Sequence, residues 1–130
     1  MKPYTSKAKK AIDLAARISK KMNYSYVGTE HILAGLIKEG TGVAAEVLTA
    51  CDVEYDKLIS MIEDLISPGD NIEVMDRDGY SPSTQRVFER ASEEADRFEC
   101  NEIGTEHLLM AIVLHGDCAA ARLLNTMGVN

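Results

Sequence analysis

Apolar residues recur every three or four positions along most of the chain, as they do on one face of an α-helix. The clearest case spans residues 8–22, and Thr5 stands where it can cap the start of that helix. The same spacing predicts further helices after Gly28, over about 43–48 and over about 54–66. No segment alternates apolar and polar residues as a half-buried strand does, so the sequence predicts an all-α fold.

The chain also contains an internal duplication with an offset of 76 residues. Gly-Thr-Glu-His at 28–31 recurs at 104–107, and the alignment runs without a gap through three predicted helices. Twelve aligned positions are identical, and four of them are consecutive, which chance rarely produces. The second copy therefore repeats the predicted helices, with Ser81 as the first cap and Pro82 at the first helical position, where its missing N–H costs nothing.

These observations divide the single domain of residues 1–130 into repeat one (4–66), a linker (67–79) and repeat two (80–130). The linker holds four acids and one base, a charge of −3, and we expect it to form an acidic surface loop. The fourth helix of repeat one has no counterpart, because repeat two ends at Asn130. We therefore expect two tandem repeats of about four helices, the second without its last helix, in a piece excised from a longer polypeptide.

Composition and charge narrow the functional classes. The chain is 45% apolar and 27% charged, with a net charge of −7 at pH 7. Residues 1–21 hold seven bases and one acid, a charge of +6, whereas residues 22–130 hold seven bases and twenty acids, a charge of −13. A mostly acidic chain with one short basic helix is a poor nucleic-acid binder and is better suited to steering a protein partner.

The sequence also indicates a cellular location. No apolar run reaches the roughly 20 residues that a membrane span requires, and the N-terminus lacks the apolar stretch of a signal peptide. Three cysteines are an odd number, which excludes a closed disulfide framework and favours a reducing compartment. We therefore expect a cytoplasmic protein without a membrane partner.

The repeated Gly-Thr-Glu-His motif has a structural and a functional interpretation. In the structural one, glycine turns the chain, threonine caps a helix, glutamate complements the positive helix start, and His31 and His107 pack or bond to neighbouring backbone. In the functional one, Glu30 and Glu106 each place an acceptor beside the backbone donors of another helix start. Such a pairing suits a ligand that carries both a cation and an anion.

Catalytic and metal sites find less support in the sequence. Adjacent Glu and His residues on a helix point about 100° apart and do not easily share one ion, and neither H-E-x-x-H nor C-x-x-C occurs. Gly35 and Gly40 have P-loop spacing, but Thr41 stands in place of the required lysine. We therefore predict no enzyme activity, no metal and no cofactor. A small metal-dependent hydrolase that uses His31 and His107 stays as an alternative.

Residues 4–54 and 80–130, with the run Tyr-Val-Gly-Thr-Glu-His-Ile-Leu-Ala-Gly-Leu-Ile-Lys-Glu-Gly at 26–40, resemble the N-terminal repeat domain of Clp-family AAA+ unfoldases, in particular the ClpC type. The resemblance implies two four-helix repeats related by pseudo-two-fold symmetry. It implies a flexible tether to AAA+ rings of the same polypeptide, which thread substrates into the ClpP peptidase. It further implies that the domain receives adaptor proteins and tagged substrates and recognises phosphorylated arginine as a degradation mark.

The same resemblance assigns roles to individual residues. Glu30 and Glu106 would take the guanidinium side of the arginine mark. Thr5 and Ser81, which cap the first helix of each repeat, would lie near its phosphate. The family's first helix usually opens Thr-x-Arg-Ala, whereas here the copies open Thr-Ser-Lys-Ala and Ser-Pro-Ser-Thr, and both carboxylates are retained.

Two aromatic positions complete the expected site. Tyr4 and Tyr80 match family positions that help wall the same surface, and packing at the helix start is an equally good interpretation of them. The leading alternative to a receptor domain of an unfoldase is a stand-alone repeat protein that acts as an adaptor or regulator without ATPase rings.

Overall fold

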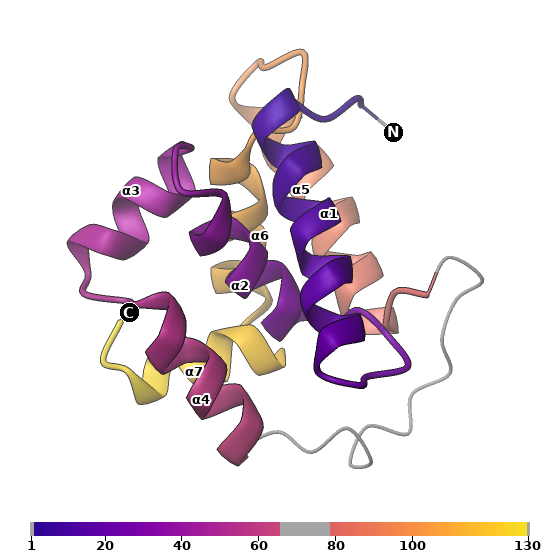
Figure 1. Ribbon diagram of the computed structural model, residues 1–130. Helices are drawn as coiled ribbons and strands as arrows, with labels where there is room; N and C mark the ends of the chain where they lie inside the picture. The colour runs from indigo at the N-terminus through magenta and orange to yellow at the C-terminus, as the bar shows by residue number, and fades with distance from the viewer. Residues whose placement is uncertain (1, 66–78, 130) are drawn as a thin grey trace.

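The computed structural model describes residues 2–65 and 79–129, which form seven helices and no strand within those ranges. In chain order the helices are α1 (Ser6–Lys21), α2 (Thr29–Glu39), α3 (Val43–Ala50), α4 (Tyr55–Leu65), α5 (Pro82–Arg97), α6 (Thr105–His115) and α7 (Ala119–Thr126) (Figure 1). The first three recur 76 residues later with the same lengths as α5, α6 and α7. The predicted all-α fold of two tandem repeats is confirmed, and the expected acidic linker lies outside the described residues except for Gly79.

The first helix of each repeat begins at the cap that the sequence predicts. The side chain of Thr5 accepts a hydrogen bond from the backbone N–H of Ala8 at 3.1 Å. Ser81 caps α5 in the same way, through the N–H of Thr84 at 3.1 Å. At the end of α2, Gly40 has a φ of 81°, a left-handed conformation that glycine adopts without steric cost.

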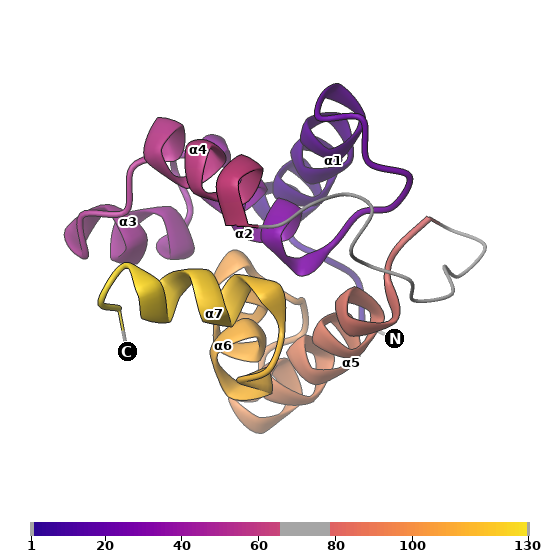
Figure 2. The same ribbon diagram turned by 90° about the horizontal axis from the view of Figure 1, so that it is seen from below.

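The central helix, α2, packs against each of the other six described helices (Figures 1 and 2). It approaches α1 so closely that a Cβ atom on Gly35 would lie 2.2 Å from the carbonyl oxygen of Ala11. The equivalent pair, α5 and α6, accommodates a methyl group at the same position, because Ala111 stands there and is fully buried. The P-loop-like spacing of Gly35 and Gly40 therefore serves helix packing and helix ending.

Reciprocal backbone hydrogen bonds join the two repeats. The N–H of Thr5 donates to the carbonyl of Ile103 at 2.9 Å. In the equivalent place, the N–H of Val27 donates to the carbonyl of Gly79 at 2.8 Å, and the N–H of Ser81 donates to the carbonyl of Val27 at 3.1 Å. Each repeat thus pairs the segment before its first helix with the loop before the other repeat's Gly-Thr-Glu-His motif, as pseudo-two-fold symmetry requires.

Because α4 has no described counterpart in the second repeat, the two repeats are covered unequally. It packs on α2 and α7, where Leu123 is 2% exposed. The equivalent residue on α3, Val47, is 46% exposed, and Val113 on α6 is likewise exposed while its equivalent Ile37 is partly buried. The symmetry therefore identifies the exposed faces of α3 and α6 as the counterpart of the surface that α4 covers on α2 and α7.

Candidate functional site

The threonines of the two Gly-Thr-Glu-His motifs cap helices of the opposite repeat. The hydroxyl of Thr29 accepts from the backbone N–H of Ala120 in the first turn of α7, at 3.1 Å. The hydroxyl of Thr105 accepts from the N–H of Ala44 in the first turn of α3, at 3.2 Å. Because all four of these residues are buried, no water can replace either hydrogen bond cheaply.

The histidines of the motifs also serve the backbone. Nδ1 of His31 accepts from the N–H of Gly28 at 2.9 Å, and Nδ1 of His107 accepts from the N–H of Gly104 at 2.8 Å. His31 is fully buried, with its ring 4.3 Å from that of Tyr24 in an edge-to-face arrangement. Burial lowers the pKa of His31 to about 4, so the imidazole is neutral at pH 7. The structural interpretation of the motif is confirmed for both histidines.

The glutamates of the motifs differ in exposure. Each carboxylate folds back over the glycine two residues before it: a Cβ atom on Gly28 would lie 2.1 Å from Oε1 of Glu30, and one on Gly104 would lie 2.2 Å from Oε1 of Glu106. Glycine leaves the room that this arrangement needs. Glu30 is only 2% exposed, whereas Glu106 is half-buried, so Glu106 is the more accessible of the two to a ligand.

The hydrogen bonds between repeats hold the backbone three residues before each glutamate beside the start of the other repeat's first helix. Glu106 lies three residues after Ile103, which bonds to Thr5 at the start of α1. In the same way, Glu30 lies three residues after Val27, which bonds to Ser81 at the start of α5. Each candidate carboxylate therefore follows a segment that bonds to the cap residue of the other repeat, Thr5 for Glu106 and Ser81 for Glu30. The sequence alone does not predict this exchange.

The two helix starts differ in the N–H groups that they offer. The first amides of a helix have no acceptor within the helix itself. In α1 the side chain of Thr5 takes the amide of Ala8, which leaves those of Ser6 and Lys7 without an intrahelical acceptor. In α5 the first residue is Pro82, which has no N–H. The start of α1 therefore offers an anion one more free backbone N–H group than the start of α5 does.

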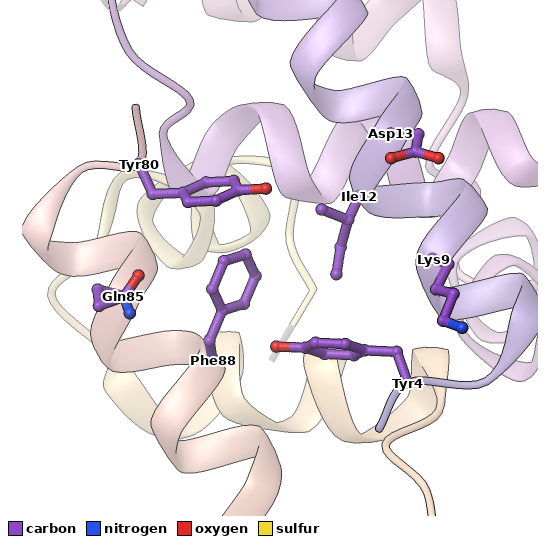
Figure 3. Close-up of a pocket in the computed structure, with 7 residues that line it drawn as sticks. All are labelled: Tyr4, Lys9, Ile12, Asp13, Tyr80, Gln85 and Phe88. Atoms are coloured by element: carbon purple, nitrogen blue, oxygen red, sulfur yellow. The ribbon is translucent and has the colours of Figure 1, made fainter. Parts of the chain in front are cut away.

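Tyr4 and Tyr80 lie on opposite sides of a cavity of about 370 Å³ between α1 and α5 (Figure 3). The ring of Phe88 lies between them, its centroid 6.1 Å from that of Tyr4 and 5.0 Å from that of Tyr80, in edge-to-face arrangements. Burial, and then the proximity of Tyr80, raises the pKa of Tyr4 to about 12, so this hydroxyl is protonated at neutral pH. The side chain of Ile12 also points into the cavity.

Sequence reasoning identified the two tyrosines of this cavity but missed Phe88 and Ile12. The 76-residue offset between the repeats could have indicated them, because Ile12 and Phe88 occupy equivalent positions of the two repeats, as Tyr4 and Tyr80 do. Two pairs of equivalent residues that meet at one place mark the position of the pseudo-two-fold axis.

The geometry gives the metal-dependent alternative no support. Within residues 2–65 and 79–129, no group of three or more His, Cys, Asp or Glu side chains is arranged to hold a metal ion. His31 and His107 use Nδ1 as an acceptor for backbone N–H groups instead. Among the described helices, none is by itself long and apolar enough to cross a membrane; α6 and α7 meet the criterion only as a pair bent by 85°.

Comparison with known proteins decides the family. Residues 3–127 match the Clp repeat (R) N-terminal domain. The chain belongs to this family. This Clp repeat domain is 38% identical over 127 residues to the probable ATP-dependent Clp protease ATP-binding subunit of Chlamydia pneumoniae, and 35% identical over the same length to the negative regulator of genetic competence ClpC/MecB of Bacillus subtilis. Each alignment covers 98% of this chain and 15% of the relative.

The solved structures agree with this assignment. The N-terminal domain of the caseinolytic protease associated chaperone ClpD from Arabidopsis thaliana superposes on the Clp repeat domain with a TM-score of 0.79 and 27% identity, covering 98% of this chain and 88% of that chain. The resemblance to the Clp N-terminal repeat domain that the motifs indicate is thus confirmed.

Proposed function

We propose that this Clp repeat domain is a receptor for adaptor proteins and tagged protein substrates of a Clp-family unfoldase, and that it binds phosphorylated arginine at the start of α1. The observation that supports the proposal is the hydrogen bond from Thr5 to Ile103, which holds the backbone three residues before the half-buried Glu106 beside the start of α1. In this role the domain works in the cytoplasm, ahead of AAA+ rings of the same polypeptide that deliver substrates to ClpP.

The chemistry of phosphoarginine matches the groups at this place. A guanidinium group presents a planar set of N–H donors, which a carboxylate such as that of Glu106 accepts in pairs. A phosphate suits the backbone amides of Ser6 and Lys7 at the positive end of the α1 dipole. Tyr4, next to the Thr5 cap, lies half-buried beside the same helix start.

The second pair, Glu30 with Ser81, is expected to bind more weakly. Glu30 is almost fully buried, so a ligand reaches its carboxylate only after the side chain moves away from Gly28. Pro82 also removes one backbone donor from the start of α5. We therefore expect one strong site and one weak site, although the sequence motif occurs twice.

Titration calorimetry with free phosphoarginine tests the proposal. We expect saturable binding to the unaltered domain and at least a tenfold loss of affinity in Glu106→Gln, because a charge-assisted hydrogen bond contributes about 1.5–3 kcal/mol. Glu30→Gln is expected to change the affinity much less. Glu102→Gln is the matched control, because Glu102 is an exposed acid in the loop before α6.

Two results would contradict the proposal. If Glu106→Gln binds phosphoarginine as strongly as the unaltered domain does, the carboxylate of Glu106 does not take part in binding. Equal binding of phosphoserine would show that the guanidinium group makes no contribution. Melting curves of all variants, recorded by circular dichroism, separate lost binding from lost folding.

A further inference from the structure

The last turns of α1 and α5, together with the loops that follow them, occupy equivalent positions of the two repeats but carry opposite charge. Residues 17–27 hold three bases and no acid, a charge of +3, and we call this segment the basic end. Residues 93–103 hold five acids and one base, a charge of −4, and we call this segment the acidic end. One domain therefore presents two surfaces of complementary charge.

Several of these charges have no ion-pair partner within the described part of the chain. At the acidic end, Lys2 pairs with Asp96 at 2.7 Å, and Arg97 lies 3.5 Å from Glu94. The acids of this end that are exposed and form no ion pair with a described residue are Glu93, Glu99 and Glu102. The bases of the basic end for which the same holds are Arg17, Lys20 and Lys21. Both ends therefore have charge to offer to a partner.

Each end also carries one half of an apolar contact. At the acidic end, the side chain of Phe98, the C-cap residue of α5, is 56% exposed. At the basic end, a cavity of about 190 Å³ is lined by the last turn of α1, the loop before α2 and Gly79, and its walls include Tyr24, Tyr26 and Val27. These three side chains are buried, and the two tyrosine rings lie edge-to-face with their centroids 5.3 Å apart. Because a cavity of about 150 Å³ is large enough to bind benzene, this one has room for a phenyl ring.

The two ends are separated within one domain. The start of α1 bonds to the loop after α5, and the loop after α1 bonds to the segment just before α5, so the two helices run in opposite directions. The basic and acidic ends therefore lie at opposite ends of this helix pair (Figure 1). Complementary surfaces at opposite ends of a molecule produce a heterologous, head-to-tail contact between copies.

We propose that the partner of each end is a second copy of this domain: Phe98 of one copy enters the cavity at the basic end of the next, and the surrounding acids meet the bases there. An aromatic side chain that fills a pocket supplies most of the affinity of such a contact, and the charges around it select the partner. An exposed ion pair strengthens binding only about 1.4–5-fold, so free domains are expected to associate weakly. Copies tethered side by side on AAA+ rings, as proposed above, have effective concentrations of about millimolar, at which a weak contact forms. The contact itself does not depend on phosphoarginine binding.

Sedimentation velocity at low salt measures this association. We expect the weight-average sedimentation coefficient of the unaltered domain to rise with concentration beyond that of a dimer, and about 0.5 M salt to reduce the rise. Lys20→Glu combined with Lys21→Glu reverses the charge of the basic end and is expected to weaken the association at least ten-fold. Phe98→Ser is expected to weaken it at least as much, whereas Phe98→Tyr keeps the ring and is expected to associate as the unaltered domain does. Lys10→Glu combined with Lys57→Glu makes the same change in net charge at exposed positions outside the basic end and is the control.

A mixture of two variants tests the head-to-tail arrangement. The domain with Lys20→Glu and Lys21→Glu keeps an unaltered acidic end, and the domain with Phe98→Ser keeps an unaltered basic end. Each variant is expected to sediment as a monomer by itself. Mixed in equal amounts, the two are expected to form a heterodimer that grows no further, because only one complementary pair of ends remains between them.

The outcomes separate this proposal from the previous one. A sedimentation coefficient that does not change with concentration overturns it, and so do equal effects of the two pairs of lysine substitutions or an association that Phe98→Ser leaves intact. A mixture of the variants that stays monomeric overturns the head-to-tail arrangement. Circular dichroism melting curves show whether each variant is folded. Phosphoarginine is titrated against Phe98→Ser, and its binding is expected to be unchanged, so either proposal can fail while the other stands.

Discussion

The close approach of α1 to α2 at Gly35 makes the effect of Gly35→Ala predictable. In the helix interior, exchanging glycine for alanine ordinarily stabilises a helix by about 1 kcal/mol. Here the added Cβ would lie 2.2 Å from the carbonyl oxygen of Ala11 and 3.0 Å from the amide nitrogen of Ala15, where ordinary contact begins at 3.4 Å. The helices must therefore separate by about 1 Å, because both neighbours are backbone atoms that cannot rotate away.

The magnitude follows from the two opposing terms. Overpacking of a well-packed core costs about 1–3 kcal/mol, occasionally more, and a clash against backbone belongs at the upper end of that range or beyond it. After the gain in helix propensity is subtracted, Gly35→Ala is expected to lower the free energy of unfolding by about 2–3 kcal/mol. For a domain of this size that corresponds to a melting temperature roughly 8–12 °C lower.

Urea unfolding followed by far-ultraviolet circular dichroism measures this change, and the second repeat provides the matched control. Ala111→Gly alters the equivalent position of α6, where a methyl group is already accommodated. It is expected to cost about 1 kcal/mol, the ordinary difference in propensity. A Gly35→Ala variant as stable as the unaltered domain, or more stable, would refute the close packing of α1 on α2.

Two further predictions concern the Gly-Thr-Glu-His motif. Thr29→Val removes the hydroxyl that caps α7 while keeping the shape of the side chain, and we expect it to lower the free energy of unfolding in urea by about 1–2 kcal/mol. The control, Thr49→Val on the exposed face of α3, is expected to cost no more than about 0.5 kcal/mol, and equal losses would contradict the role of the cap. His31 has a pKa of about 4 in the folded domain and about 6.5 in the unfolded chain, so protons bind the unfolded chain preferentially. The contribution of this residue to the free energy of unfolding is therefore complete above pH 6.5 and falls by about 3 kcal/mol as the pH is lowered to 4. His31→Asn is expected to flatten this part of the pH dependence, and an unchanged slope would show that other groups cause it.

The helices and their caps were predictable because the chemistry that sets them is local. Thr5, Pro82 and Gly40 act on residues within one turn of themselves, and the apolar spacing of each helix is visible in a short window. The duplication added the order of the helices, since each element found in one repeat implied another in the second.

The exchange between repeats was not predictable, because it depends on residues far apart in the sequence. Thr29 bonds to Ala120 and Thr105 bonds to Ala44, and nothing in either segment indicates a partner in the other repeat. The unequal burial of Glu30 and Glu106 is of the same kind, because both stand in the same four-residue run, Gly-Thr-Glu-His. Local pattern identified the candidate residues, and only their tertiary surroundings distinguish the accessible carboxylate from the enclosed one.

The reciprocal threonine caps also bear on how such a domain can arise. A single repeat on its own would leave the first amides of its third helix without the hydroxyl that satisfies them, and would leave the strand-like segment before its first helix unpaired. Two separate copies could supply each other with both, as the halves of an isologous homodimer do. Fusing the genes of such a dimer keeps each of these hydrogen bonds but makes it intramolecular. Each half is then free to diverge in sequence, as the equivalent residues Lys9 and Gln85 have done.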